Sequence, residues 1–278
     1  MDLTEFVLRL KLQKNIGYVK SLKVLRQLPT LSEIDESCLD QLDLPKSLKQ
    51  DVTKAMHNEK SRSLIFQLHS QCTVISFFDE RYPAQLREIY QPPLILFAKG
   101  NLNLLRKKIT TIVGSRQPTS YSQEVLSHLI PVLIKKKIVI ASGLAQGVDT
   151  IAHRETLSAN GKTIAVVGNG LNHFYPRQNQ RLQDEISRHG LLISEYLPDT
   201  PPRPFRFPER NRILAGLSEN VIVTEAKHHS GSLITANLAL QENRNIYAVP
   251  GPITSLLSRG PNELIAAGAQ PLIDYSLE

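Results

Sequence analysis

Residues 220–243 read NVIVTEAKHHSGSLITANLALQEN, and this stretch contains the pattern that decides the fold. It opens with the apolar run NVIVTEA, which is typical of a strand buried on both faces of a sheet. The small polar residues Ser230, Gly231 and Ser232 follow, and a helical pattern begins near Ser232. The stretch therefore predicts a strand, a short turn and a helix in succession.

The same unit recurs along the C-terminal part of the chain. The other apolar runs are ITTIVG (109–114), KIVIAS (137–142), TIAVVG (163–168), LLISE (191–195) and NIYAV (245–249). Helical segments separate most of these runs and begin near Tyr121, Val148, Gln178 and Pro208. This alternation predicts a doubly wound α/β domain, in which helices cover both faces of a mostly parallel sheet.

The N-terminal part has a different character. Leu3, Phe6, Val7 and Leu10 recur at helical spacing, and Gly17 marks a tight turn before a second helical pattern. Two interpretations stay open: a helical packing or oligomerisation module, or a hairpin whose Gly turn presents amides to a DNA phosphate. We expect a small all-α domain over residues 1–60 and the α/β domain over residues 61–278.

Composition narrows the classes of partner and compartment. The net charge of +7 favours an anionic partner, and four arginines fall between Arg203 and Arg212. The chain has no apolar run long enough for a membrane span and no secretory signal, so we expect a cytoplasmic protein. Cys38 and Cys72 are far apart and have no CxxC partners, which supports neither a disulfide framework nor a zinc site.

Several turns that follow the apolar runs share one chemistry. The turns GSRQPTSYS, SGLAQGVD, GNGLNHFYPRQN and EAKHHSGSLITA are small, carry Gly or Ser, and lead towards a helix. The carboxyl ends of parallel strands meet at one edge of a sheet, and helix N-termini there bind phosphate. With Arg116 and Arg177, these turns predict an anion-binding rim; each turn alone is also explained by ordinary turn chemistry and helix capping.

Signs of catalysis are weak. A nucleophilic serine needs a base and an orienting group, and no carboxylate is evident beside His228 and His229. The GNG at Gly168–Gly170 lacks the third glycine of a dinucleotide fingerprint, and the Walker pattern is absent from the sequence. We therefore expect no enzymatic activity, no cofactor and no metal.

The motifs taken together resemble those of the DNA-processing protein A family, also called DprA or Smf. The ordered set runs from DERYPAQLREIYQPPLILFAKG through VGSRQPTSY, SGLAQGVDTIAH, GNGLNHFYPRQN, LISEYLPDTPPRPFRFPERNRILAGLS and EAKHHSGSLITANLALQENRNIYAVPG to GPNELIAAGA. It covers roughly residues 79–269 and is specific as a set, although no single motif is. The first 60 residues resemble, more weakly, the sterile-alpha-motif-like domain of many members.

The resemblance implies a fold, a function and a set of site residues. It implies an extended Rossmann fold that binds single-stranded DNA without turnover, protects incoming strands in natural transformation, loads the RecA recombinase and forms a homodimer. Carried over by motif, the nucleic-acid-binding residues are Gly114, Ser115, Arg116, Ser142, Gly143, Phe174, Arg177, Arg210, Arg212, Ser230, Gly231 and Ser232.

Some of these roles have alternatives. Arg212 also fits an ion pair with Glu209 or Glu195 that holds the fold, and Phe174 also fits a core position. The sequence departs from the family pattern at Asn172, where Asp is usual, and at Ser115, where Ala is frequent.

Two other functions compete with DNA binding. One is a nucleotide hydrolase of the lysine-decarboxylase-like Rossmann type, whose PGGxGTxxE pattern is missing from this sequence. The other is an interaction scaffold that works through the N-terminal helices.

Overall fold

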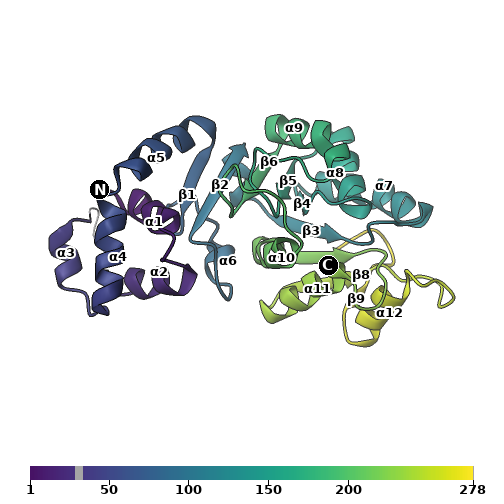
Figure 1. Ribbon diagram of the computed structural model, residues 1–278. Helices are drawn as coiled ribbons and strands as arrows, with labels where there is room; N and C mark the ends of the chain where they lie inside the picture. Colours follow the sequence, from purple (N-terminus) through teal and green to yellow (C-terminus); the bar gives the residue numbers. More distant parts are fainter. Residues whose placement is uncertain (29–33, 278) are drawn as a thin grey trace. The chain divides into compact units, whose positions relative to one another are not determined.

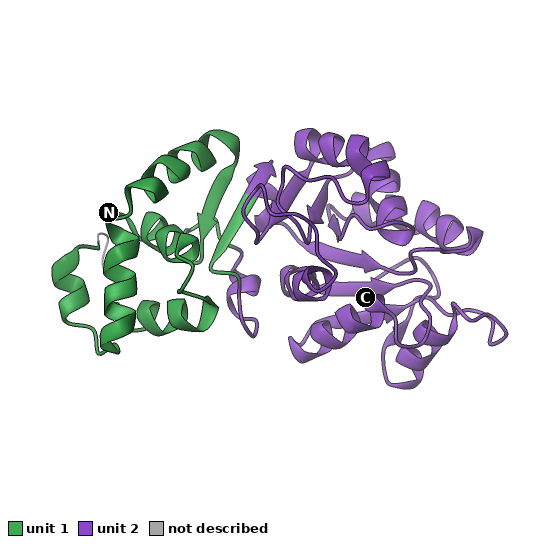
Figure 2. Cartoon of the chain, viewed as in Figure 1, with its two compact units in different colours: residues 1–82, 93–97 green, residues 83–92, 98–278 purple. Residues whose placement is uncertain are grey.

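The computed structural model describes residues 1–28 and 34–277, and the chain forms two compact units (Figure 2). Unit 1 comprises residues 1–82 and 93–97, and unit 2 comprises residues 83–92 and 98–278. The domain boundary expected at residue 60 falls inside a helix of unit 1, which continues to Gln71 and leads into a strand of the same unit. Local helical periodicity does not reveal that a strand packs with the helices that precede it.

Unit 1 is mainly helical. Phe6, Val7 and Leu10 are buried, which agrees with the helical spacing of these residues in the sequence. The hydroxyl groups of Thr4 and Ser76 lie 2.8 Å apart in a hydrogen bond that ties the first helix to the first strand. The elements of the unit are α1 (Leu3–Leu12), α2 (Tyr18–Leu25), α3 (Glu36–Asp40), α4 (Lys46–Met56), α5 (Glu59–Gln71) and β1 (Thr73–Ser76), with the beginning of β2 (Ile95–Gly100) (Figure 1).

Unit 2 is built on a parallel sheet, as the uninterrupted apolar runs predict. Its strands pair in the order β6-β5-β4-β3-β7-β8-β9, and each of these pairings is parallel. The strands are β3 (Ile109–Val113), β4 (Val139–Ser142), β5 (Thr163–Val166), β6 (Leu191–Ser194), β7 (Asn220–Val223), β8 (Asn245–Ala248) and β9 (Gln270–Pro271).

The strand order contains one reversal. After β3 the chain adds β4, β5 and β6 on one side, and it then returns to place β7, β8 and β9 on the other side of β3. The loops that leave β3 and β7 therefore diverge and open a crevice between them. In open α/β sheets, ligands bind at such a switch point, outside the carboxyl ends of the strands.

Helices cover both faces of this sheet. They are α7 (Ser120–Lys135), α8 (Val148–Ser158), α9 (Gln180–His189), α10 (Arg206–Leu217), α11 (Gly231–Gln241) and α12 (Arg259–Ala266), with the shorter α6 (Ala84–Arg87), η1 (Leu102–Arg106) and η2 (Arg177–Asn179). Within the described residues, no helix is both long and apolar enough to cross a membrane.

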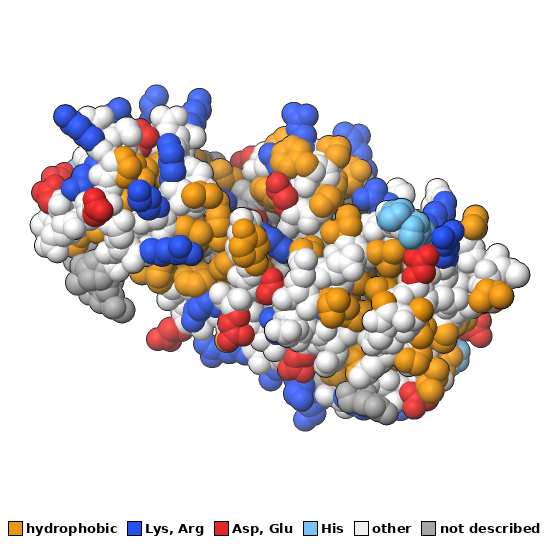
Figure 3. All heavy atoms as spheres, turned by 90° about the horizontal axis from the view of Figure 1, so that it is seen from below, with side chains coloured by type: hydrophobic (Ala, Val, Ile, Leu, Met, Phe, Trp, Pro, Cys, Tyr) orange, Lys and Arg blue, Asp and Glu red, His pale blue; other side chains and the backbone are white. Residues whose placement is uncertain are grey.

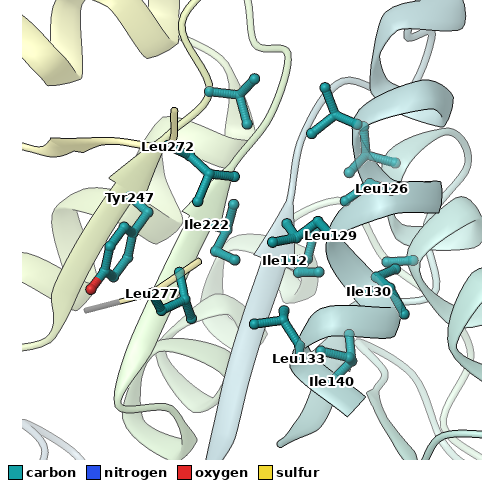
Figure 4. Packing of buried hydrophobic residues seen from close by; sticks show 14 residues of the cluster. Ile112, Leu126, Leu129, Ile130, Leu133, Ile140, Ile222, Tyr247, Leu272 and Leu277 are labelled. Carbon is teal, nitrogen blue, oxygen red and sulfur yellow. The ribbon is translucent and has the colours of Figure 1, made fainter. Parts of the chain in front are cut away.

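The two faces carry separate hydrophobic clusters. Ile112 and Ile222 point to the face where Leu129 and other residues of α7 pack (Figure 4). Val113 and Val223 point to the opposite face, where small residues of α10 and α11 approach the strands closely. Because successive strand residues alternate between faces, a strand covered on both sides must be apolar throughout. This requirement explains the apolar runs in the sequence.

Candidate functional site

A pocket of about 550 Å³ lies at the switch point, within unit 2. The loops after β3, β4 and β7 form its walls together with the first turns of α10 and α11. It contains Gly114, Ser115, Arg116, Arg210, Ser230, Gly231 and Ser232 of the expected site residues. The rim predicted at the carboxyl ends of the strands is thus a pocket, and its centre lies between β3 and β7.

The loop after β3 is held by its backbone and leaves Arg116 exposed. The Ser115 amide donates to the carbonyl of Glu225, and the Val148 amide donates to the carbonyl of Ser115 at 3.0 Å. Gly114 is required here, because a Cβ at this position would lie 2.5 Å from Val148 and 2.6 Å from Thr224. The Arg116 side chain lines the pocket and is solvent-exposed, so its charge is available to a ligand.

A buried carboxylate occupies the N-terminus of α7. Glu225 is 2% exposed and accepts hydrogen bonds from the amide of Thr119 at 2.9 Å, from the Thr119 hydroxyl at 2.8 Å and from the Ser122 hydroxyl at 2.7 Å. An anionic side chain is stabilised at this end of a helix dipole. This N-terminus therefore already has its anion, and it is not free for a phosphate.

A second carboxylate binds the turn that precedes α8. Asp149 accepts hydrogen bonds from the amides of Gly143 at 3.1 Å and Ala145 at 3.2 Å. Burial raises the pKa of the Asp149 carboxyl, and the nearby Arg210 guanidinium opposes that rise. Two amides of the turn SGLAQGVD are thus bound by its own aspartate.

The N-terminus of α11 differs from that of α7. Ser230 is its N-cap, but no side chain accepts a hydrogen bond from the first amides of this helix. The Ser230 hydroxyl is buried and has no hydrogen-bond partner among the described residues. A Cβ on Gly231 would meet nothing within 4 Å, so the space in front of the helix is open. The first amides of a helix have no intrahelical acceptor, and these face the pocket.

Ser232 connects α11 to the β3 loop. Its hydroxyl donates a 2.7 Å hydrogen bond to the carbonyl of Gly114, and the residue is 9% exposed. The hydroxyl is therefore committed to a contact within the protein. The backbone of Ser232 remains at the mouth of the pocket.

Arg210 lines the pocket but is itself buried. It is 5% exposed, and its guanidinium donates to the carbonyl of Gly143 at 2.7 Å and to the carbonyl of Val166. Burial lowers the pKa of this guanidinium to about 10, and Asp149 opposes the decrease, so Arg210 stays charged at neutral pH. The side chain joins the ends of β4 and β5 beneath the pocket.

The remaining expected residues lie outside the set that lines the pocket. Ser142 is fully buried and donates to the carbonyl of Ile112 at 2.7 Å, and Gly143 packs against the Arg210 guanidinium. Arg212 donates to both carboxylate oxygens of Glu195 at 2.8 Å, which matches the ion-pair alternative. Phe174 is partly buried, and Arg177 is exposed away from the pocket lining.

Sequence reasoning missed three residues of the pocket wall. Lys227 adds a second cation beside Ser230, and its place between strand β7 and the SGS turn could have indicated it. Phe207 presents an aromatic ring that stacks on Tyr175 with the ring centroids 5.0 Å apart. The amide of Asn211 donates to the carbonyl of Gly231 at 3.4 Å. Phe207 and Asn211 gave no local signal, because α10 brings them to the pocket from a distant loop.

Comparisons with known proteins identify the family of this chain. The family model for DNA recombination-mediator protein A matches residues 73–276. DNA processing protein DprA of Bacillus subtilis is 45% identical over 199 residues, which are 71% of this chain and 67% of the relative. Protein Smf of Escherichia coli is 36% identical over 267 residues, which are 96% of this chain and 71% of the relative.

Two solved structures are similar over most of their length. The X-ray structure of DprA from Streptococcus pneumoniae has a TM-score of 0.87 and 38% identity, and the match covers 98% of this chain and 95% of that one. The Helicobacter pylori DprA structure, which concerns a single-stranded DNA binding mode, has a TM-score of 0.68 and 33% identity, with 75% and 94% covered. The chain described here belongs to the DNA recombination-mediator protein A family, the DprA/Smf proteins.

Proposed function

We propose that this chain binds single-stranded DNA in the switch-point pocket, with one backbone phosphate at the N-terminus of α11. The observation that carries the proposal is the open, uncapped start of α11 at the pocket, in contrast to the start of α7, which the Glu225 carboxylate occupies. Free amides and the helix dipole there favour an anion. Arg116 and Lys227 on the pocket wall supply positive charge for the same phosphate.

The pocket wall also offers a surface for a base of the bound strand. Phe207 offers an aromatic ring at the wall, and stacking on a base is sequence-tolerant because every base has a π-face. The Helicobacter pylori relative, whose structure concerns single-stranded DNA binding, supports the same ligand class for this chain. We infer slight sequence preference and affinity that comes mainly from phosphate contacts.

The test is binding of a fluorescent single-stranded oligonucleotide across a salt series, followed by anisotropy. We expect Arg116→Ala to weaken binding by about 1.5–3 kcal/mol, roughly 10- to 100-fold, because it removes a charged contact to phosphate. Arg177→Ala is the informative companion, since Arg177 is also an exposed arginine of the expected set but lies outside the pocket lining. Arg154→Ala on α8 is a control for loss of one positive charge. Equal binding by the native protein and Arg116→Ala would refute the pocket assignment.

We further propose that the bound strand is protected and passed to the RecA recombinase during natural transformation. Membership in the recombination-mediator family supports this role. Its test is the rate at which RecA assembles on single-stranded DNA in the presence of this protein, together with nuclease digestion of the bound strand. We expect the native protein to speed RecA assembly and to slow digestion of the strand. We expect Arg116→Ala to lose both effects. Assembly that is unchanged by the native protein would contradict the mediator role.

We also propose that two copies associate through an apolar surface of unit 2. Ile253 is 95% exposed and Leu256 is 73% exposed, and both border a groove of about 470 Å³ beside α12. Figure 3 shows hydrophobic side chains on the side of unit 2 that faces down in Figure 1, where α11 and α12 lie. Exposed apolar residues of this size mark interaction surfaces. A second copy is the occupant that the family resemblance favours, with unit 2 as the dimerising part.

A further inference from the structure

Six lysines lie at the amino ends of three neighbouring strands, at the opposite edge of the sheet from the pocket. Strands β3, β4 and β5 are adjacent and parallel, so their amino ends meet at one edge (Figure 1). The residues, called here the amino-edge lysines, are Lys107 and Lys108 before β3, Lys135, Lys136 and Lys137 before β4, and Lys162 before β5.

The backbone places these lysines close together. The Val139 amide donates to the carbonyl of Lys108 at 2.9 Å, and the Ile140 amide donates to the carbonyl of Lys162 at 3.1 Å. Lys108 and Lys162 therefore flank the start of β4 on its two sides. Neighbouring strands are about 4.8 Å apart, so the backbones of these two lysines are separated by roughly 10 Å.

Among the described residues, no ion pair neutralises the charge at this edge. All six side chains are exposed, and none takes part in the ion pairs found in the described parts of the chain. Lys136 and Lys162 donate only to backbone carbonyls, those of Leu277 and His189, each at 3.2 Å. The acidic groups nearby are few: Asp274, whose pKa Lys136 helps to lower, and Glu219 before β7.

Ordinary helix chemistry explains only half of the cluster. Lysines in the last turn of a helix interact favourably with its dipole, which accounts for Lys135, Lys136 and Lys137 at the end of α7. Lys107, Lys108 and Lys162 precede strands and have no such role. Gathering like charges on adjacent loops costs repulsion, and an anionic partner would offset that cost.

We propose that the amino-edge lysines form a second, sequence-independent contact for single-stranded DNA, which extends the strand's footprint beyond the pocket. The inference rests on the proposed function, because it assigns the same ligand class to the opposite edge. The strands between the two edges are four or five residues long. At about 3.3 Å per residue, the strands span ~15 Å, but a bound strand must pass outside the helices that cover the sheet, such as α7 with its 16 residues, so its path between the edges is longer.

The experiment compares a short and a long oligonucleotide on the full chain. The variant carries Lys107→Gln, Lys108→Gln and Lys162→Gln, which spare the end of α7, and a matched control carries Lys46→Gln, Lys54→Gln and Lys60→Gln in unit 1. An oligothymidylate of about 6 nucleotides fits one binding site, and one of about 30 exceeds it. Anisotropy over a salt series gives the affinity and the salt dependence of each.

We expect the variant to bind the short oligonucleotide like the native protein. With the long oligonucleotide, its slope of log affinity against log salt should decrease in magnitude by about 2, since three phosphate contacts at about 0.7 each are lost. The matching Lys→Arg triple variant should restore the slope, because charge alone is read. Circular dichroism and thermal denaturation check that the variants fold.

Each remaining outcome decides the question. A long-oligonucleotide slope that changes no more than in the unit 1 control would overturn the second contact. If the native protein does not bind the short oligonucleotide, the pocket assignment is refuted instead. The slope with the long oligonucleotide still tests the amino-edge lysines independently. Equal losses in the variant for both oligonucleotides would show a general effect on folding or charge and would also refute the proposal.

Discussion

His153 is a fully buried histidine on α8, and its environment makes the protein sensitive to acid. Its Nδ1 lies 2.7 Å from the hydroxyl of Thr163, and its Nε2 has no partner among the described residues. Burial, with a smaller contribution from Arg210, lowers the pKa of the imidazole from 6.5 to about 3. The folded protein therefore holds His153 neutral over a pH range in which the unfolded chain protonates it.

The free energy of unfolding should decrease as pH falls through this window. Between pH 6.5 and about 3 the unfolded state binds one more proton at this residue, so stability declines by about 1.4 kcal/mol per pH unit. From pH 7 to pH 5, His153 should thus account for a loss of about 2 kcal/mol. Urea unfolding at both pH values measures the loss, which His153→Gln should lack. The exposed His128→Gln serves as control, and identical pH dependence in native protein and His153→Gln would contradict the prediction.

Arg212 should affect stability rather than DNA binding. Its Nη2 donates to both carboxylate oxygens of Glu195 in an ion pair in which both side chains are mostly buried, at 17% and 14% exposed. Arg212→Ala leaves the Glu195 carboxylate without its partner. We expect the free energy of unfolding to decrease by about 1–3 kcal/mol, less than for a fully buried pair. Thermal denaturation and oligonucleotide binding, measured together, separate the two roles. An unchanged melting temperature with binding as weak as in Arg116→Ala would instead make Arg212 a DNA contact.

At the scale of elements, the start of α11 offers a test in which stability and binding change in opposite directions. Gly231→Asp places a carboxylate in the first turn, where it interacts favourably with the helix dipole by about 0.3–1 kcal/mol. The same carboxylate repels a phosphate from the pocket. We therefore expect equal or higher thermal stability and at least about tenfold weaker binding of single-stranded DNA, since a lost contact of 1.4 kcal/mol corresponds to that factor.

Gly231→Asn is the matched control for the preceding variant, because it adds a side chain of the same size without charge. The open space at Gly231 accommodates either residue. If Gly231→Asp and Gly231→Asn bind DNA alike, charge at this turn has no influence on the ligand, and the α11 turn is a helix cap alone.

The elements were predictable from sequence because their cause is local. The apolar runs and the small residues after them predicted most strands and helices of unit 2 to within a few residues, as at Tyr121 and Gln178, where the helices begin at Ser120 and Gln180. They did not predict α12 or β9. Strand order is not encoded in periodicity, so the switch point between β3 and β7 could not be foreseen. The sequence predicted the edge of the sheet at which the pocket lies, but not the position of the pocket along that edge.

The sequence also did not show which of the four turns leaves its amides open to a ligand. Each looked like a phosphate-binding helix start, yet Glu225 and Asp149 fill two of them with their own carboxylates. Glu225 lies 106 positions from Thr119, so no local pattern announces their contact. The Asp149 contacts with Gly143 and Ala145 are local and lie within one motif. The sequence could not show that the start of α7 is already occupied, because that depends on a contact between distant segments.

At the scale of the whole molecule, the proposed DNA contacts all lie in unit 2. Every residue that lines the switch-point pocket belongs to unit 2, and so do the amino-edge lysines. Unit 1 has its own buried residues, including Phe6 and Val52, and forms a separate compact body. The two proposed DNA contacts therefore share one rigid sheet, and a helical scaffold role for unit 1 is compatible with both.

Association of two copies should depend on the apolar groove beside α12. Leu256→Glu places a charge within this surface, and burying an unpaired charge in an interface is strongly unfavourable. Sedimentation equilibrium should give twice 31.2 kDa for the native chain and 31.2 kDa for the variant. Val19→Glu, at a position in unit 1 that is 75% exposed, should leave the mass doubled.

Dissociation of the dimer should lower the affinity for long DNA and leave the affinity for short DNA unchanged. A dimer presents two pockets, so a long strand that engages both gains from the high effective concentration of the second site. Leu256→Glu should therefore bind an oligonucleotide of about 6 nucleotides as the native protein does, and bind one of about 30 less tightly. A native chain that sediments as a monomer at the concentrations of the binding assay would contradict the association. A Leu256→Glu variant that remains dimeric would place the interface elsewhere on the molecule.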